Sequence, residues 1–207
     1  MGRLSRRFIM LLAASLMALS FAASTAFAKN QDIWADSGYS FSSVKSLYFE
    51  DVVFDLSADC DDDILEKKMS DFLRTTAAKT DLRIVPKGES HPTGLVIKTK
   101  VENWSSSSQY HPPYTTWETR SETYHWYDRN GNRHSDVRTF QVPVKHPGYT
   151  SYFSTVKVRY DGYTPEGTLV YSHREERTKE EANDHYKMFE RISKEFLSKL
   201  MKQIKKQ

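Results

Sequence analysis

The 207-residue chain lacks the motifs that mark common enzyme families, and it contains a single cysteine. The metalloprotease HExxH, the nucleophile-elbow GxSxG, the phosphate-binding loop, the dinucleotide-binding GxGxxG and the redox CxxC are all absent. Because Cys60 stands alone, no intramolecular disulfide can form, and the fold must depend on packing. We therefore expect a non-catalytic protein without a cofactor.

Residues 1–28 show the three-part pattern of a secretory signal peptide. Its basic part contains Arg3, Arg6 and Arg7. Residues 8–21 are apolar or small, and Ala26-Phe27-Ala28 forms a small-x-small cleavage site. We expect Sec-dependent export to the periplasm, the cell envelope or the exterior, with a mature chain that starts at Lys29. The alternative, an uncleaved membrane anchor, is disfavoured because the apolar stretch is short for a spanning helix.

Neither sign of charge predominates in the expected mature chain. The whole chain has 30 basic and 27 acidic residues, but three of the arginines and none of the acidic residues belong to the leader. The mature chain is therefore formally neutral, and its bulk charge does not indicate a nucleic-acid-binding protein.

The order of the expected elements is typical of an α+β two-layer sandwich. We predict a mostly antiparallel sheet covered on one face by two helices, at about 62–79 and 183–205, where apolar residues recur at three- and four-residue spacing. Besides a hairpin, strands are expected over 44–54, 82–85, 95–104, 151–160 and 168–174. Residues 29–43 are polar and are expected to be a loose lead-in to a single domain over 44–207.

The stretch 114–144 is predicted to form one long β-hairpin that folds at Asn130-Gly131. A two-residue loop would place Phe140 opposite Ser121, and it would separate an apolar face from a charged one. The residues then assigned to the core are Trp117, Phe140, Val142 and Val144. The residues assigned to the other face are Glu118, Arg120, Glu122, Tyr124 and Trp126.

Four aromatic residues on or beside this hairpin are candidate partner-binding residues. They are Tyr110, Tyr114, Tyr124 and Trp126. Exposed aromatic side chains suit contacts with proteins or glycans. The alternative is that they reflect ordinary strand composition, or that another element covers them.

An acidic segment before the first helix has the spacing of a calcium-binding loop. The six positions are Asp55, Ser57, Asp59, Asp61, Asp63 and Glu66. Cys60 occupies the position at which such loops have glycine, and Asp62 replaces the apolar residue that usually follows it. The alternative is that the aspartates cap the helix that follows.

Histidines provide the remaining chemical hypothesis. The two-residue loop would place His125 opposite Asp136, the beginning of an acid–base site. No serine or cysteine nucleophile is placed beside this pair by the sequence, and such pairs are ordinary on strand surfaces. A small secreted hydrolase is therefore the less favoured alternative.

The order of elements also resembles that of a known group. A strand, a helix, a meander that ends in Gly-Thr-Leu-Val-Tyr-Ser (167–172) and a closing amphipathic helix resemble a loose group of exported bacterial α/β proteins. The group includes the amino-terminal domain of TolB, the curli secretion protein CsgG and uncharacterised envelope proteins of similar size. The resemblance implies a binding or assembly role in the envelope, although this chain lacks the lipid-anchor cysteine common in the group.

These observations favour an exported protein-binding or assembly module whose partner is an envelope protein or a second copy of itself. A module that binds glycan or cell wall through the tyrosines and tryptophans is the alternative. We expect neither nucleic-acid binding nor a transmembrane segment after signal cleavage.

Overall fold

The computed structural model describes residues 28–56, 58, 60, 62–86, 89, 94–180 and 184–206. The predicted signal peptide therefore lies outside the described residues, except for Ala28. The chain divides into two compact units. The sheet–helix unit comprises the described residues up to Ser107 and from Phe153 onward, and the hairpin unit comprises Ser108–Tyr152. The sequence predicted one domain over 44–207, whereas the structure has two compact units.

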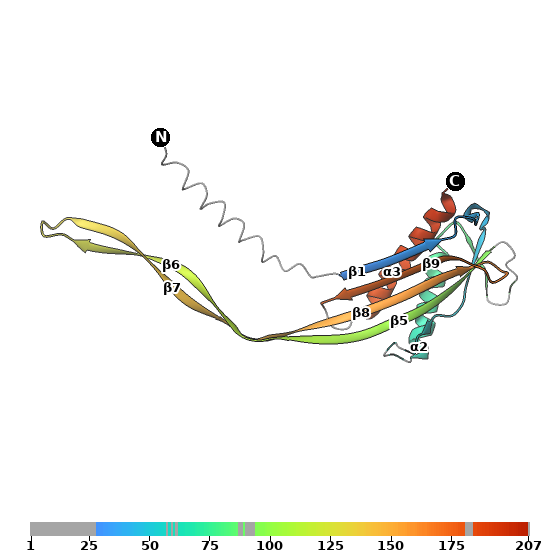
Figure 1. Ribbon diagram of the computed structural model, residues 1–207, viewed down its shortest axis with the longest axis horizontal. Coiled ribbons are helices and arrows are strands. Elements are labelled where there is room, and N and C mark those ends of the chain that lie inside the picture. Colours follow the sequence, from blue (N-terminus) through green and yellow to red (C-terminus); the bar gives the residue numbers. More distant parts are fainter. Residues whose placement is uncertain are drawn as a thin grey trace, which may run out of the picture. The chain divides into compact units, whose positions relative to one another are not determined.

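The larger sheet has seven strands (Figure 1). Its strands are β1 (Ala28–Ala35), β2 (Ser46–Phe49), β3 (Val53–Phe54), β4 (Arg83–Ile84), β5 (Gly94–His111), β8 (Tyr149–Tyr163) and β9 (Leu169–Lys179). Their spatial order is β1-β9-β8-β5-β2-β4, and β3 also pairs with β5. A second sheet consists of only β6 (Tyr114–Tyr127) and β7 (Arg133–His146).

The larger sheet is mixed, which corrects the prediction of a mostly antiparallel one. β9 is antiparallel to both β1 and β8. β2 is parallel to both β4 and β5, and β3 is also parallel to β5. Parallel neighbours need a crossover connection, and the helix α2 (Asp63–Ala77) supplies it between β2 and β4.

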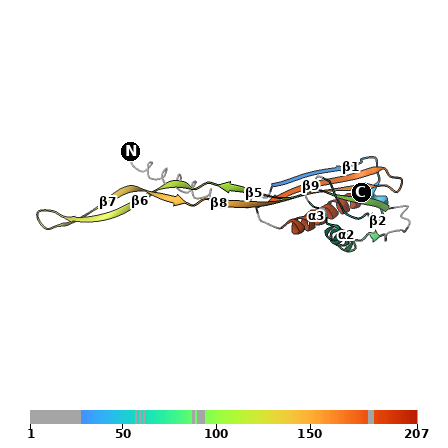
Figure 2. The same cartoon turned by 90° about the horizontal axis from the view of Figure 1, so that it is seen from below.

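Both predicted helices are present, and they lie on the same face of the sheet (Figure 2). The carboxylate of Asp62 accepts hydrogen bonds from the backbone N–H groups of Ile64 and Leu65, so Asp62 is the N-cap of α2. The second helix, α3 (His185–Lys205), buries the apolar stripe that its sequence predicted. No helix in the described part of the chain is both long enough and apolar enough to cross a membrane.

The core lies between α3 and the inner face of the sheet. Phe196 of α3 stacks on Tyr160 of β8, with ring centroids 4.1 Å apart and an angle of 5° between the rings. The predicted alternation of β5 is confirmed, because Leu95, Ile97 and Val101 are fully buried. Side chains on the opposite face of the sheet are mostly charged, as in the pair between Arg174 and Glu102. The sheet therefore has one buried face and one solvated face.

Two stretches predicted to be irregular are strands instead. Residues 29–35, expected to be part of a loose lead-in, belong to β1 and pair with β9 along their whole length. Residues 105–111, expected to be a loop, continue β5. Polar composition misled the prediction in both places, because pairing with a neighbouring strand overrides weak intrinsic strand preference. The strand expected over 44–54 is correspondingly interrupted, as β2 and β3.

The Asp62→Ala variant should lower the free energy of unfolding by about 1 kcal/mol, because two N–H groups of the first turn of α2 lose their acceptor. The measurement is chemical denaturation. Asp63→Ala is the matched control, since it removes the same charge from the same turn without removing those two bonds. Equal losses in the two variants would contradict the capping role of Asp62.

Candidate functional site

The hairpin unit carries most of the exposed apolar surface of the described chain. Ten of the fifteen exposed large hydrophobic residues lie in this unit. They are Tyr110, Tyr114, Trp117, Tyr124, Trp126, Tyr127, Val137, Phe140, Tyr149 and Tyr152. Every residue of β6 is exposed on both of its faces. The four aromatic residues singled out from the sequence are thus all exposed, and all lie in one unit.

The turn of the hairpin is where the sequence placed it, but its loop is longer. Asp128 and Asn132 are bonded through their backbones, which leaves Arg129, Asn130 and Gly131 as the loop. Gly131 has a φ of 80°, the left-handed conformation that closes a three-residue hairpin loop. The Asp128 carboxylate accepts hydrogen bonds from the backbone N–H groups of Asn130 and Asn132, each at 2.9 Å.

The longer loop shifts the pairing of β6 and β7 by one residue from the predicted register. Arg120, not Ser121, lies opposite Phe140, and Trp117 lies opposite Pro143. The predicted core face is also wrong, since Trp117 is 65% exposed and Phe140 is 38% exposed. The register argument assumed that one face is buried. No such penalty opposes this register, because the structure leaves both faces of β6 exposed.

The two faces of the hairpin differ in chemistry. We call the face with the even-numbered residues the aromatic–charged face, because it carries most of the rings and charges. Its residues on β6 are Tyr114, Thr116, Glu118, Arg120, Glu122, Tyr124 and Trp126. The odd-numbered face is rich in hydroxyl groups. Its hydroxyl-bearing residues include Thr115, Thr119, Ser121, Thr123, Ser135 and Thr139.

Histidines stack on aromatic rings at both ends of the aromatic–charged face. Tyr114 stacks on His146 with 4.5 Å between ring centroids, and Trp126 stacks on His134 at the same distance. These pairs are directly opposite each other in the β6–β7 register. Cross-strand aromatic pairs stabilise a sheet that has no second layer. The rings are therefore held in position while much of their surface stays open to solvent.

The predicted acid–base pair of His125 and Asp136 does not form. His125 lies opposite Ser135, and Asp136 lies opposite Tyr124, whose hydroxyl donates a hydrogen bond to it at 3.2 Å. This hydrogen bond raises the pKa of Tyr124. The one-residue shift places His125 and Asp136 on opposite faces of the hairpin, so they cannot act on one substrate atom.

The carboxylate of Asp128 is the electrostatic centre of the turn. The side chain of His134 is bonded to it at 3.0 Å, and the Asn132 side chain donates to it as well. These bonds, that with His134 first, hold the pKa of Asp128 at about 2, well below its usual range. The sequence offered a signal for this, because an aspartate two residues before Asn130-Gly131 is typical of side-chain-bonded turns.

In an NMR titration, the Asp128 carboxyl should have a midpoint near pH 2. Since the ionised form accepts the bonds, they contribute fully above the ordinary pKa of 3.8 and are lost as the pH falls through about 2. His134→Ala should raise the midpoint toward the ordinary value. His125→Ala is the control and should leave it unchanged, because His125 is on the other face. An unshifted midpoint in His134→Ala would refute this assignment.

The calcium-loop candidate can be described only in part. Ser57, Asp59 and Asp61 lie outside the described residues, so calcium binding stays a prediction. Asp55 forms an ion pair with Lys100 at 2.7 Å, and Glu66 accepts a hydrogen bond from the backbone N–H of Phe54. The part of the chain that the structure describes contains no group of three or more His, Cys, Asp or Glu that could hold a metal ion.

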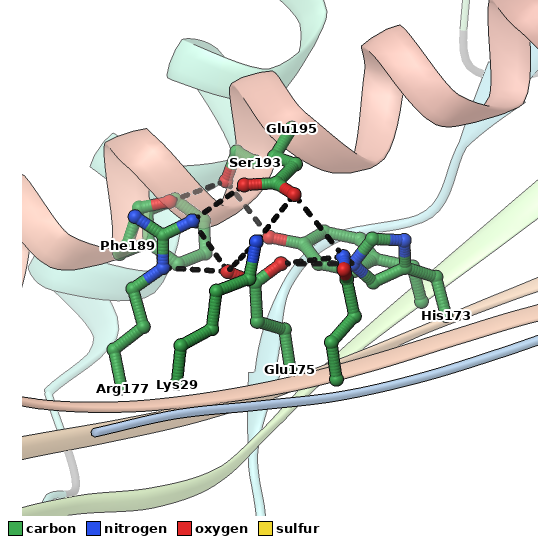
Figure 3. A network of polar contacts seen from close by, with 9 residues as sticks. Lys29, His173, Glu175, Arg177, Phe189, Ser193 and Glu195 are labelled. Carbon is green, nitrogen blue, oxygen red and sulfur yellow. Dashed lines mark hydrogen bonds and ion pairs between the residues drawn. The ribbon is translucent and has the colours of Figure 1, made fainter. Parts of the chain in front are cut away.

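A polar network that the sequence did not predict lies beneath α3 in the sheet–helix unit (Figure 3). At its centre is the fully buried carboxylate of Glu175, on β9. Arg177 and Lys29 are both paired with Glu175, and both are also paired with Glu195 of α3. Lys29 lowers the pKa of Glu195 through its hydrogen bond. Two cations thus balance two carboxylates.

Histidine and tyrosine side chains complete this network. His173, also fully buried, lies 3.1 Å from Glu175 through its Nε2 atom, and its Nδ1 atom has no hydrogen-bond partner among the described residues. A buried donor without a partner is costly, so we assign the ring proton to Nε2. Tyr160 donates to Ser193, which in turn donates to the Phe189 carbonyl group. The network ties β1, β8 and β9 to one side of α3.

Glu175→Ala should lower the free energy of unfolding by about 3–5 kcal/mol, because two cations would be left with a single carboxylate between them. Glu176→Ala is the matched control. Its side chain points to the other face, where it pairs with Lys157 at 3.5 Å, and its loss should cost less than about 1 kcal/mol. Thermal and chemical denaturation measure both. Similar small losses would contradict the central role of Glu175.

Comparisons with known proteins give structural neighbours only. No family model and no curated protein matches the chain. The chain is similar to the PelC dodecamer from Paraburkholderia phytofirmans, with 14% identity and a TM-score of 0.43 over 87% of this chain and 100% of that one. It is also similar to a DUF4136 family protein from Bacteroides thetaiotaomicron, with 9% identity and a TM-score of 0.36 over 86% of this chain and 95% of that one.

A third neighbour is a PDZ domain protein from Parabacteroides distasonis, with 14% identity and a TM-score of 0.36. The alignment covers 94% of this chain but only 40% of that protein. At TM-scores this low the neighbours carry no argument. The function is therefore argued from the residues of this chain.

Proposed function

We propose that this protein is an exported, non-catalytic module that binds another protein through the aromatic–charged face of its hairpin unit. The observation that carries the proposal is the concentration of exposed aromatic side chains in this one unit. Export rests on the predicted signal peptide at 1–28.

The composition of the hairpin is that of a binding surface. Tyrosine, tryptophan and arginine are the residues most often responsible for binding energy at protein interfaces. The aromatic–charged face presents Tyr124 and Trp126 near the turn and Arg120 at mid-strand. Burying one such aromatic side chain contributes about 1.5–3 kcal/mol, so a few are enough to support specific association.

The hairpin also has no packing layer of its own. Two strands without a covering layer are marginally stable in water. Here the cross-strand rings and the Asp128 turn hold the hairpin together, while both faces of β6 stay exposed. Exposed apolar surface of this extent marks an interaction site.

The proposal can be tested with a photoreactive amino acid at Phe140, which lies on the aromatic–charged face. In its own cells, the exported protein should cross-link to one discrete protein, identified by mass. Combining Tyr124→Ala with Trp126→Ala should lower the cross-link yield about tenfold or more. The N-terminal sequence of the exported protein should start at Lys29.

Trp34→Ala provides the matched control for this experiment. Trp34 lies on β1 in the other unit and has the same exposed fraction as Trp126, 47%. This variant should retain the full cross-link yield. A yield that the hairpin variant does not change would refute the proposed surface. Sedimentation with cell-wall material that requires Tyr124 and Trp126, without any protein cross-link, would replace the protein partner with a glycan.

A further inference from the structure

The backbone of β6 has an open edge whose hydrogen-bonding pattern can be assigned. Neighbouring residue pairs in an antiparallel ladder alternate between bonded and non-bonded. Asp128 and Asn132 form a bonded pair, and β6 and β7 continue the same register. The even-numbered residues of β6 are therefore bonded to β7, and the odd-numbered residues direct their N–H and C=O groups to the other edge. These outward residues on β6 are Thr115, Trp117, Thr119, Ser121, Thr123, His125 and Tyr127.

The two edges of the hairpin are not equally protected against pairing with another strand. On β7, Pro143 occupies an odd-numbered position, so an outward N–H group is missing from that edge. Proline on an edge strand is a common device against edge-to-edge pairing. β6 contains no proline in its fourteen residues. The sheet has only these two strands, so the open edge of β6 is the one fit to accept another strand.

The charges of β6 show which strand would fit. Glu118, Arg120 and Glu122 alternate in sign along one face, and Arg120 is already 3.5 Å from Glu118 within the strand. An antiparallel copy of β6 placed about a two-fold axis at Thr119 would bring Glu118 opposite Arg120 twice. An axis at Glu118 or at Arg120 would instead set like charges opposite each other, which destabilises a sheet.

We propose that β6 pairs antiparallel with β6 of a second copy of this chain, about a two-fold axis at Thr119. The inference rests on the proposed function and names its partner. Bonded pairs would join the outward residues, with Trp117 opposite Ser121 of the second copy. On the aromatic–charged face, Tyr114 would lie opposite Tyr124 of the second copy, and two Glu118–Arg120 pairs would form an alternating square of four charges. The product is a four-stranded sheet.

Charge reversal tests the pairing with the purified mature protein in sedimentation velocity. Glu118→Arg alone and Arg120→Glu alone should each weaken self-association about tenfold or more, because like charges would face each other twice. A mixture of the two variants should associate again, since each copy then supplies the charge the other needs. Arg133→Glu, on β7, makes the same charge change as Arg120→Glu away from the open edge, and it should associate as the wild type does.

Cysteine substitution tests the position of the axis, in a Cys60→Ser background. Thr119→Cys should form an interchain disulfide, because bonded antiparallel pairs have Cα atoms about 5.5 Å apart, within disulfide range. Thr123→Cys, two positions further along the same edge, should not. Preferential cross-linking at Ser121→Cys would move the axis by one bonded pair and overturn the assigned register.

The results separate this inference from the proposed function. Single variants that do not self-associate and a mixture that does would support pairing through β6. A wild-type protein that stays monomeric at every concentration would overturn the pairing. If its cross-links to a different protein still depended on Tyr124 and Trp126, the proposed function would stand without the self-pairing. Loss of both would overturn both.

Discussion

The packing of α3 on the inner face of the sheet is the contact on which the sheet–helix unit depends. Phe196 stacks on Tyr160, and the apolar stripe of α3 is buried along its length. The same helix supplies Glu195 to the polar network, so β1 and β9 are joined to α3 by charge as well as by apolar burial. An ion pair this deep is stable only when every member has its counter-charge, which makes the network sensitive to the loss of one residue.

The hairpin unit is organised by a different principle. It has no layer to bury its side chains, and its order comes from backbone pairing, from rings stacked across the strands and from the bonds of Asp128. One chain thus combines a unit whose surface is mostly polar with a unit whose rings are left outside. This division of labour is expected of a scaffold that carries a recognition element.

The features predicted correctly from the sequence are those encoded by local patterns. The stripes of α2 and α3, the cap at Asp62, the alternation of β5 and the turn at Asn130-Gly131 all depend on residues near each other in the chain. The hairpin register failed by one residue because the Asp128 side chain stabilises a longer loop, which the spacing of apolar residues does not reveal.

Features that depend on distant residues could not be predicted. The pairing of β1 with β9 joins residues far apart in the sequence, and the polarity of β1 disguised it as a loop. The burial of Glu175 follows from counter-charges on β1 and α3, which no local pattern connects to it. The aromatic candidates were found because rings in a strand are visible in the sequence, whereas their exposure is a property of the missing layer.

Lys29 links the maturation of the chain to its fold. It is the second residue of β1 and directly follows the predicted cleavage site after Ala28. A cut at that site keeps the lysine, but a cut one residue later would leave Glu175 and Glu195 with Arg177 as the only cation in the network. The protease that releases the chain thereby decides whether its core is electrically neutral, so the site of cleavage is itself under structural constraint.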